Sequence, residues 1–272
     1  MKNILVVVDN IDNVKELLKK SLRLSSNNVY ILVFEPSAIK TIETVLSTDK
    51  SENCHTVLID AAMVKSDNKA EKVIEIAAHH NCDTIAITRQ KRHSSEPDFS
   101  FEKSLLKGLR KTNLLICSDK RWKPAMNIMA TLDIENKNEV QANLNSAVFD
   151  VSVKVANNIN GHLHFMTVIP ISRISQELDI VESEEVLYKQ GDKVKAKLVN
   201  YLKQKSSTIE YSSHITAGLP YNEIPSAAKK QKIDLVILGN VGRTGIKGLI
   251  VGNTAEKILQ RLSVDVLIVK TT

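Results

Sequence analysis

Residues 2–10 read KNILVVVDN, and residues 126–134 read MNIMATLDI. Each stretch is a mostly apolar run that ends at an aspartate, Asp9 in the first and Asp133 in the second. Runs that are apolar at nearly every position are typical of strands covered on both faces in a parallel sheet. Two later pairs match in the same order: CDTIAIT (82–88) with IDLVILG (233–239), and TNLLICSDK (112–120) with SVDVLIVKT (263–271). The two halves of the chain therefore indicate an internal duplication.

Helix-length segments separate these strands, and the alternation predicts repeated βαβ units. We expect two tandem Rossmann-like α/β domains, each a five-stranded parallel sheet of order 3-2-1-4-5 flanked by helices. The predicted domains are residues 1–120 and 124–272, joined by the short polar segment 118–124. Such a join leaves the domains little reach, so we expect them to pack together. The expected strands are 3–8, 29–34, 56–59, 84–88, 114–117, 127–132, 163–169, 211–216, 235–238 and 264–269.

The composition argues against nucleic-acid and membrane partners. The formal charge is +6, but the lysines are interleaved with Asp and Glu, which is typical of solvated helix faces. Aromatic residues make up 4% of the chain and offer few surfaces on which bases could stack. No apolar stretch approaches the ~20 residues of a membrane helix and the first residues lack a signal-peptide core, so we expect a cytoplasmic protein. Cys54, Cys82 and Cys117 show no CxxC spacing and predict buried free thiols.

Glycine is concentrated in one loop of the second half, LGNVGRTGIKGLIVGNTAEKIL (238–259). The loop follows a buried strand and leads into a helix that we expect Asn253 to cap, with Glu256 three positions on. Glycines let a backbone approach a ligand closely, and a helix N-terminus adds unpaired N–H donors and the positive end of its dipole. The loop therefore predicts an anion site. The alternative is a Gly-rich connection without a ligand.

The expected strand order places this loop opposite Asp133. In an open parallel sheet, ligands bind beyond the carboxyl ends of the strands where the strand order reverses. With the order 3-2-1-4-5, that point lies between the first strand, which ends at Asp133, and the fourth, which the loop follows. A carboxylate there can bond a ribose hydroxyl or help to hold a metal ion.

Several motifs resemble the signature of the universal stress protein family. They are Gly239-x2-Gly242-x9-Gly252, with Arg243-Thr244-Gly245 inside it and Thr254-Ala255-Glu256 after it. The strand ending at Asp133, the segment MTVIP (166–170) and Gly218-Leu219-Pro220 are similar to that family as well. The resemblance covers nearly the whole chain. It implies two domains of the adenine nucleotide alpha hydrolase-like fold, as in the two-domain members of the family from bacteria.

The resemblance also implies a ligand, ATP or a related adenine nucleotide, with Mg²⁺ left open as its companion. Aspartate and valine at two strand ends line the adenosine pocket in this family, and the glycine segment holds ribose and phosphates. Asn253 departs from the family, which has Ser or Thr there, but its amide can still bond a phosphate. The residues so implied are Asp133, Val168, Gly239, Gly242, Arg243, Gly252, Asn253 and Thr254.

The first half lacks the glycines of this loop, and residues 88–108 read TRQKRHSSEPDFSFEKSLLKG. We therefore expect no nucleotide site there, although Asp9 is present. Arg89, Lys91, Arg92 and His93 are expected to form a solvated charged loop. His162 and His164 alternate on one strand and share a face, but no further metal ligand is fixed by the sequence, so no metal site is expected.

These features favour a binding and signalling protein over an enzyme, and no catalytic residue is assigned. One alternative is slow ATP hydrolysis or nucleotidyl transfer, for which Asp133 and Glu135 are the available carboxylates. Another is a different nucleotide-conjugated ligand. Members of the family pair domains through their last strands, which implies an intramolecular pseudo-dimer through 114–117 and 264–269. A further homodimer is left open.

Overall fold

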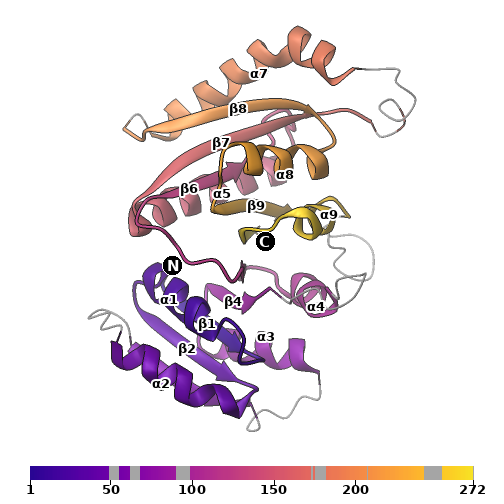
Figure 1. The fold of residues 1–272 in the computed structure, drawn as a ribbon. Coiled ribbons are helices and arrows are strands. Elements are labelled where there is room, and N and C mark those ends of the chain that lie inside the picture. Colours follow the sequence, from indigo (N-terminus) through magenta and orange to yellow (C-terminus); the bar gives the residue numbers. More distant parts are fainter. Residues whose placement is uncertain are drawn as a thin grey trace.

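The computed structural model contains one mixed ten-stranded sheet with helices on both faces (Figure 1). It describes residues 1–48, 55–61, 68–89, 99–172, 174, 182–206, 208–241 and 253–271. The strand order is β3-β2-β1-β4-β5-β10-β9-β6-β7-β8. Each half therefore has the expected 3-2-1-4-5 order, and the two five-stranded sheets are joined edge to edge.

The first half alternates strands and helices along the chain, and its strands pair in parallel. Apolar residues at helical spacing bury one face of each helix, as the expected βαβ units require. The elements are β1 (Asn3–Val8), α1 (Val14–Leu24), β2 (Asn28–Val33), the 3-10 helix η1 (Pro36–Ala38), α2 (Ile39–Thr48), β3 (His55–Asp60), α3 (Lys69–His79), β4 (Thr84–Thr88), α4 (Ser100–Gly108) and β5 (Asn113–Cys117).

The second half repeats this plan with longer helices on the first and second crossovers. Between β8 and α8, Gly218 adopts a φ of 147°, and a Cβ there would lie 2.9 Å from a carboxylate oxygen of Glu223. The turn therefore requires glycine. The elements are β6 (Met126–Thr131), α5 (Glu139–Ile159), β7 (Gly161–Pro170), α7 (Ser183–Lys205), β8 (Tyr211–Gly218), α8 (Pro220–Lys230), β9 (Leu235–Val241), α9 (Asn253–Arg261) and β10 (Asp265–Thr271).

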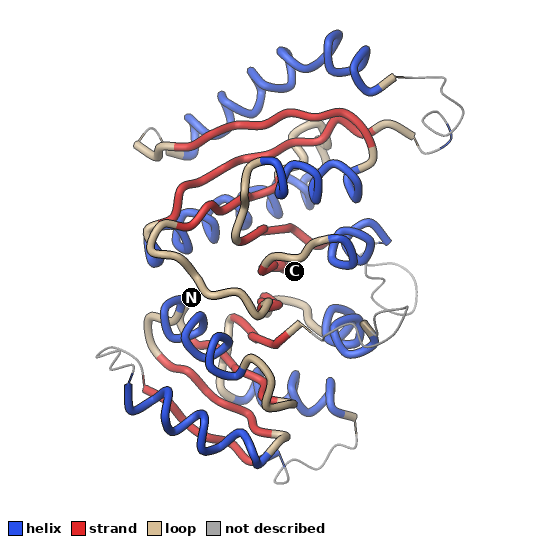
Figure 2. Tube along the Cα trace, in the orientation of Figure 1, coloured by secondary structure: helices blue, strands red, loops and turns tan. Residues whose placement is uncertain are grey.

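Helices cover both faces of the sheet (Figure 2), and an apolar core lies on each face. Side chains of α1, α2, α5 and α7 pack on one face, and those of α3, α4, α8 and α9 pack on the other. The central strands are almost fully buried between them, which explains their continuous apolar sequences, whereas the outer strands β3 and β8 are more exposed. No helix in the described part of the chain is both long and apolar enough to span a bilayer.

The halves meet where β5 and β10 pair antiparallel, the pairing that the family resemblance implied. Leu115 pairs with Leu267, and each is the third residue of its strand, so the contact has an approximate two-fold symmetry. Because this pairing continues the hydrogen-bonded ladder, neither strand remains a free edge.

A buried ion pair strengthens this junction. Lys20 Nζ lies 2.9 Å from a carboxylate oxygen of Asp265, and both side chains are 1% exposed. The same carboxylate accepts hydrogen bonds from the backbone N–H of Ser118 and from Trp122 Nε1, both in the segment that joins the halves. A charge this deep needs such partners, because an unpaired buried carboxylate is costly.

Candidate functional site

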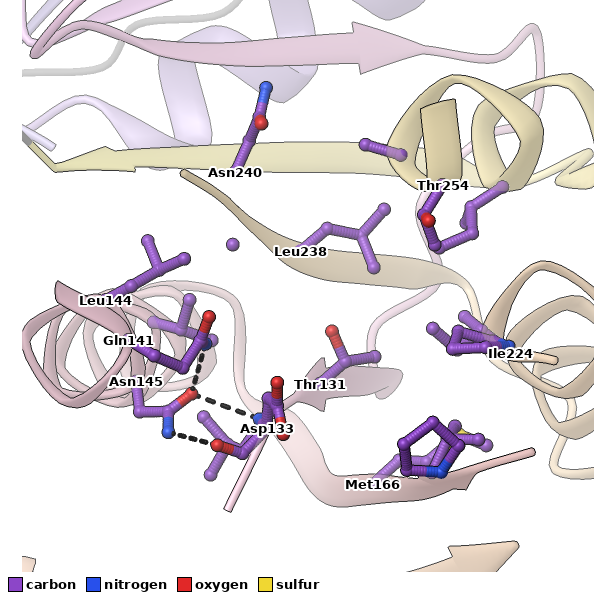
Figure 3. Close-up of a pocket in the computed structure, with 18 residues that line it drawn as sticks. Thr131, Asp133, Gln141, Leu144, Asn145, Met166, Ile224, Leu238, Asn240 and Thr254 are labelled. Carbon is purple, nitrogen blue, oxygen red and sulfur yellow. Dashed lines mark hydrogen bonds between the residues drawn. The ribbon is translucent and has the colours of Figure 1, made fainter. Parts of the chain in front are cut away.

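A cavity of about 360 Å³ lies at the carboxyl ends of β6 and β9 in the second half (Figure 3). β6 is the strand at which the order reverses, because its neighbours are β7 on one side and β9 on the other. Strand β7 and helices α5, α8 and α9 contribute the remaining walls. The lining residues are Thr131, Leu132, Asp133, Gln141, Leu144, Asn145, Val148, Met166, Val168, Pro170, Pro220, Ile224, Leu238, Gly239, Asn240, Thr254, Ala255 and Ile258.

Asn145 of α5 holds the backbone of Asp133 from both sides. Its Nδ2 donates to the Asp133 carbonyl oxygen at 2.8 Å, and its Oδ1 accepts from the Asp133 N–H at 3.1 Å. Gln141 Nε2 donates to the same Oδ1, one helical turn earlier, and Figure 3 shows this chain of bonds. Asn145 is 5% exposed whereas Asp133 is exposed, so the backbone is fixed and the carboxylate is left accessible at the cavity.

Apolar side chains form the wall opposite α5. Met166 and Val168 come from β7, Ile224 from α8, and Leu238 from β9. Together with the polar groups at Asp133 this gives the mixture of apolar wall and few polar groups that small-molecule pockets show. The cavity volume also falls in the usual range of about 300–1,000 Å³.

The β9 end of the cavity depends on a close approach between strand and helix. A Cβ on Gly239 would lie 2.7 Å from the Leu144 side chain of α5, so any larger residue would clash with that side chain. Thr254, Ala255 and Ile258 of α9 line the cavity from the other side of β9. The first turn of α9 therefore lines the cavity, and the first N–H groups of a helix have no partner within the helix.

Four of the residues implied by the family resemblance line this one cavity: Asp133, Val168, Gly239 and Thr254. Asn253 is the first residue of α9, and its side chain is not among those that the structure describes. Gly242, Arg243 and Gly252 lie outside the described residues. Their contact with a ligand remains a prediction.

Neither Asn145 nor Gln141 was expected at the site from the sequence. Both stand on an amphipathic helix, where a polar residue usually marks the solvated face. Glu135, one of the two carboxylates weighed for catalysis, is bound to Lys197 of α7 at 2.7 Å. The Glu135 carboxylate is therefore already engaged in an ion pair within the protein.

The corresponding place in the first half is filled by Lys69. Its Nζ lies 2.7 Å from Asp9 Oδ2, and it stands 5.2 Å from the ring centre of Phe34 and 4.6 Å from that of Phe101. The ammonium is thus paired with a carboxylate and held against two aromatic faces. Asp9 is therefore engaged within the protein.

Histidines gather on β7 and β8. His164 Nδ1 lies 2.9 Å from His214 Nε2, and the His162 ring stands edge-on to the His164 ring with centroids 4.8 Å apart. The expected shared face of His162 and His164 is confirmed. No group of three or more His, Cys, Asp or Glu suited to a metal ion occurs among the described residues.

The two described cysteines are buried free thiols, as expected. Burial raises the pKa of Cys82 to about 12, with a further contribution from the charge of Asp83. Burial also raises the pKa of Cys117. Thiols with raised pKa values are unreactive near neutrality. Cys54 lies outside the described residues.

Comparison with known families and proteins agrees with this architecture. Residues 143–270 match the model of the universal stress protein family. A universal stress protein E homolog from Haemophilus influenzae is 26% identical, and the alignment covers 99% of this chain and 97% of that protein.

Solved structures share the fold over the full length. A functionally unknown protein from Pseudomonas aeruginosa has a TM-score of 0.74 at 19% identity, covering 99% of this chain and 92% of its own. A universal stress protein from Archaeoglobus fulgidus has a TM-score of 0.66 at 15% identity, covering 98% of both chains. Residues 143–270 are thus similar to the universal stress protein family, and the chain as a whole resembles the two-domain form represented by universal stress protein E.

Proposed function

We propose that the second half binds ATP or a related adenine nucleotide in the 360 Å³ cavity, and that the protein is a non-catalytic stress-response protein of the cytoplasm. The single observation that carries this proposal is the convergence of Asp133, Val168 and Thr254 on one cavity at the point of strand reversal. Ligands of open α/β sheets bind at such points.

Each wall suits one part of a nucleotide. The apolar side chains of Met166, Val168 and Ile224 offer a surface for the base. The exposed carboxylate of Asp133 is an acceptor for ribose hydroxyls. The first turn of α9 supplies N–H donors and the positive dipole end for phosphates. Gly242, Arg243 and Gly252 are proposed to continue this phosphate site.

The test is the stability of the full chain with ATP, ADP and AMP, each with and without Mg²⁺. A ligand that binds only the folded state should add about 2.7 kcal/mol to the free energy of unfolding at a hundredfold excess over its dissociation constant. Asp133→Asn should weaken binding, because the amide accepts less strongly from ribose hydroxyls than a carboxylate does. Unchanged unfolding with all three nucleotides would contradict the proposal.

Mass spectrometry of the protein purified under non-denaturing conditions would identify a different nucleotide-conjugated ligand. Measurement of released phosphate over hours with wild type and Asp133→Asn would detect slow hydrolysis. We expect none, since Glu135 is engaged with Lys197.

A further inference from the structure

The first half contacts the cavity helix α9 through Arg89, which directly follows β4. One guanidinium nitrogen, Nη1, donates to the carbonyl oxygens of Leu259 and Leu262 at 3.0 and 2.9 Å. The other, Nη2, donates to the carbonyl oxygen of Val264 at 3.0 Å. The sequence-based expectation that Arg89 belongs to a solvated loop is wrong, because its guanidinium binds the other half of the chain.

These three carbonyls belong to the last turn of α9 and to the turn that leads into β10. The final carbonyls of a helix lack intrahelical partners and carry the negative end of its dipole. The planar fork of a guanidinium can bond several of them at once, which a lysine ammonium does less well. Arg89 therefore fixes the C-terminal end of α9 in position and in direction.

The opposite end of the same helix lines the cavity through Thr254, Ala255 and Ile258. α9 has nine residues and is about 13 Å long, so a shift at one end is carried to the other. A second contact lies near the first turn, where Lys103 of α4 binds Glu256 at 3.1 Å. The first half thus holds α9 at both ends.

A reciprocal contact offers a matched control. Lys270 of β10 donates from Nζ to the carbonyl oxygen of Leu106 in the last turn of α4, at 2.7 Å. Burial lowers the pKa of Lys270 to about 8. Like Arg89, Lys270 is a cation that reaches across the junction to a helix end. However, α4 contributes no lining residue to the cavity.

We infer that Arg89 is a positioning residue for the ligand cavity, so that the first half controls binding in the second by fixing α9. This inference rests on the proposed nucleotide binding. Because coupling between two sites is reciprocal, a ligand at the N-terminal end of α9 also strengthens the contact between the halves.

The experiment compares Arg89→Met with Lys270→Met in the full chain, by titrating ATP well below the unfolding temperature. We expect Arg89→Met to weaken ATP binding about five- to hundredfold, the usual span of such coupling. Lys270→Met should stay within about twofold of wild type, since it leaves α9 in place. Arg89→Lys should give an intermediate affinity, because it keeps the charge but not the fork.

Hydrogen exchange without ligand gives a second readout. The amides of residues 254–258 should exchange faster in Arg89→Met than in Lys270→Met or wild type. Equal exchange in the two variants, or equal ATP affinity, overturns the positioning role. A wild-type protein that binds no nucleotide would instead overturn the proposed function, while the exchange comparison still tests the fixing of α9. If Arg89→Met does not fold, Arg89→Lys carries both measurements.

Discussion

The two halves share one fold, yet at the same place one holds a cavity and the other holds a lysine. Ile4 of β1 pairs with the first residue of β4, as Ile128 of β6 pairs with the first residue of β9. Five residues after each isoleucine stand Asp9 and Asp133. The Asp9 side chain is 8% exposed and bound to Lys69, whereas Asp133 is exposed at the cavity.

The other members of the Lys69 contact also have counterparts in the cavity wall. Lys69 and Pro220 are the first residues of α3 and α8, and Phe101 and Thr254 are the second residues of α4 and α9. Phe34 corresponds to Val168, because the register of β1 with β2 places Phe34 beside Asp9, and the register of β6 with β7 places Val168 beside Asp133. At these three positions the first half has a long or aromatic side chain, whereas the second half has a smaller residue that lines the cavity.

The two halves therefore differ in their side chains at this strand end while the strand order of their sheets is the same. The ammonium of Lys69 neutralises the carboxylate, and the two rings supply the apolar volume. None of these changes touches the strand pairing.

The largest expected effect on stability concerns the junction between β5 and β10. There the first half has the neutral Asn113 where the second half has the charged Asp265. Asn113 and Asp265 are the first residues of β5 and β10, and each accepts from a backbone N–H of the other half, those of Lys270 and Ser118. Asp265 also binds the buried Lys20. Asp265→Asn should therefore lower the free energy of unfolding by about 3–5 kcal/mol, because Lys20 loses its counter-charge. Urea unfolding would measure the loss.

Asn113→Ala is the control for this variant, since it removes a neutral hydrogen bond worth about 1 kcal/mol. An Asp265→Asn protein no less stable than Asn113→Ala would show that the buried pair contributes little.

Transfer of the first half's residues into the second should remove the cavity. In Val168→Phe/Pro220→Lys, the new lysine is expected to pair with Asp133 and the new ring to fill the apolar wall. ATP affinity should fall at least about a hundredfold, equivalent to about 2.7 kcal/mol. Calorimetry would measure it. The fold should persist, because the first half carries both residues at these positions. Binding at wild-type strength would show that the ligand lies elsewhere.

The converse change should destabilise the first half. Lys69→Met leaves Asp9 nearly buried without its cation, and we expect a loss of about 2 kcal/mol from a charge-assisted hydrogen bond and the ring contacts. Lys123→Met breaks a pair of similar length, 2.8 Å, whose lysine is 62% exposed, and should cost at most about 1 kcal/mol. Comparable losses in the two variants, from thermal or urea unfolding, would argue against a special role for Lys69.

Much of the fold could be predicted from sequence. The bounds of β1 and β4 coincide with those expected, because a continuous apolar run marks each strand. β7 and β9 extend further than expected, to Gly161–Pro170 and Leu235–Val241. Their added residues pair through backbone hydrogen bonds, which hydropathy does not report. Periodicity therefore locates elements better than it locates their ends.

The site residues could be predicted only where their place in a sequence pattern or motif marks them. Asp133 and Val168 follow from strand ends and from the family resemblance. The bond between Asp9 and Lys69 could not be anticipated, because it joins residues 60 positions apart whose sequence surroundings are ordinary. Arg89 was placed wrongly for the same reason, since its carbonyl partners lie at least 170 positions away. Such contacts are fixed by the packing of the halves.

The smallest expected effect is a difference in acid sensitivity between the halves. In the register of β7 against β2, the buried His164 takes the place of Tyr30. Burial, and then the nearby His162 and His214, lower the pKa of His164 to about 4. Burial, His162 and Lys230 also lower the pKa of His214.

A folded-state pKa below the ordinary value of about 6.5 means that the unfolded chain binds more protons between these two values. The contribution of His164 to stability is therefore complete above pH 6.5 and is lost as the pH falls toward 4. His164→Tyr, which copies the first half, should reduce the loss of stability between pH 7 and pH 5 by on the order of 1 kcal/mol. Urea unfolding at both pH values would measure it. An identical loss in wild type and variant would show that His164 is not the acid-sensitive group.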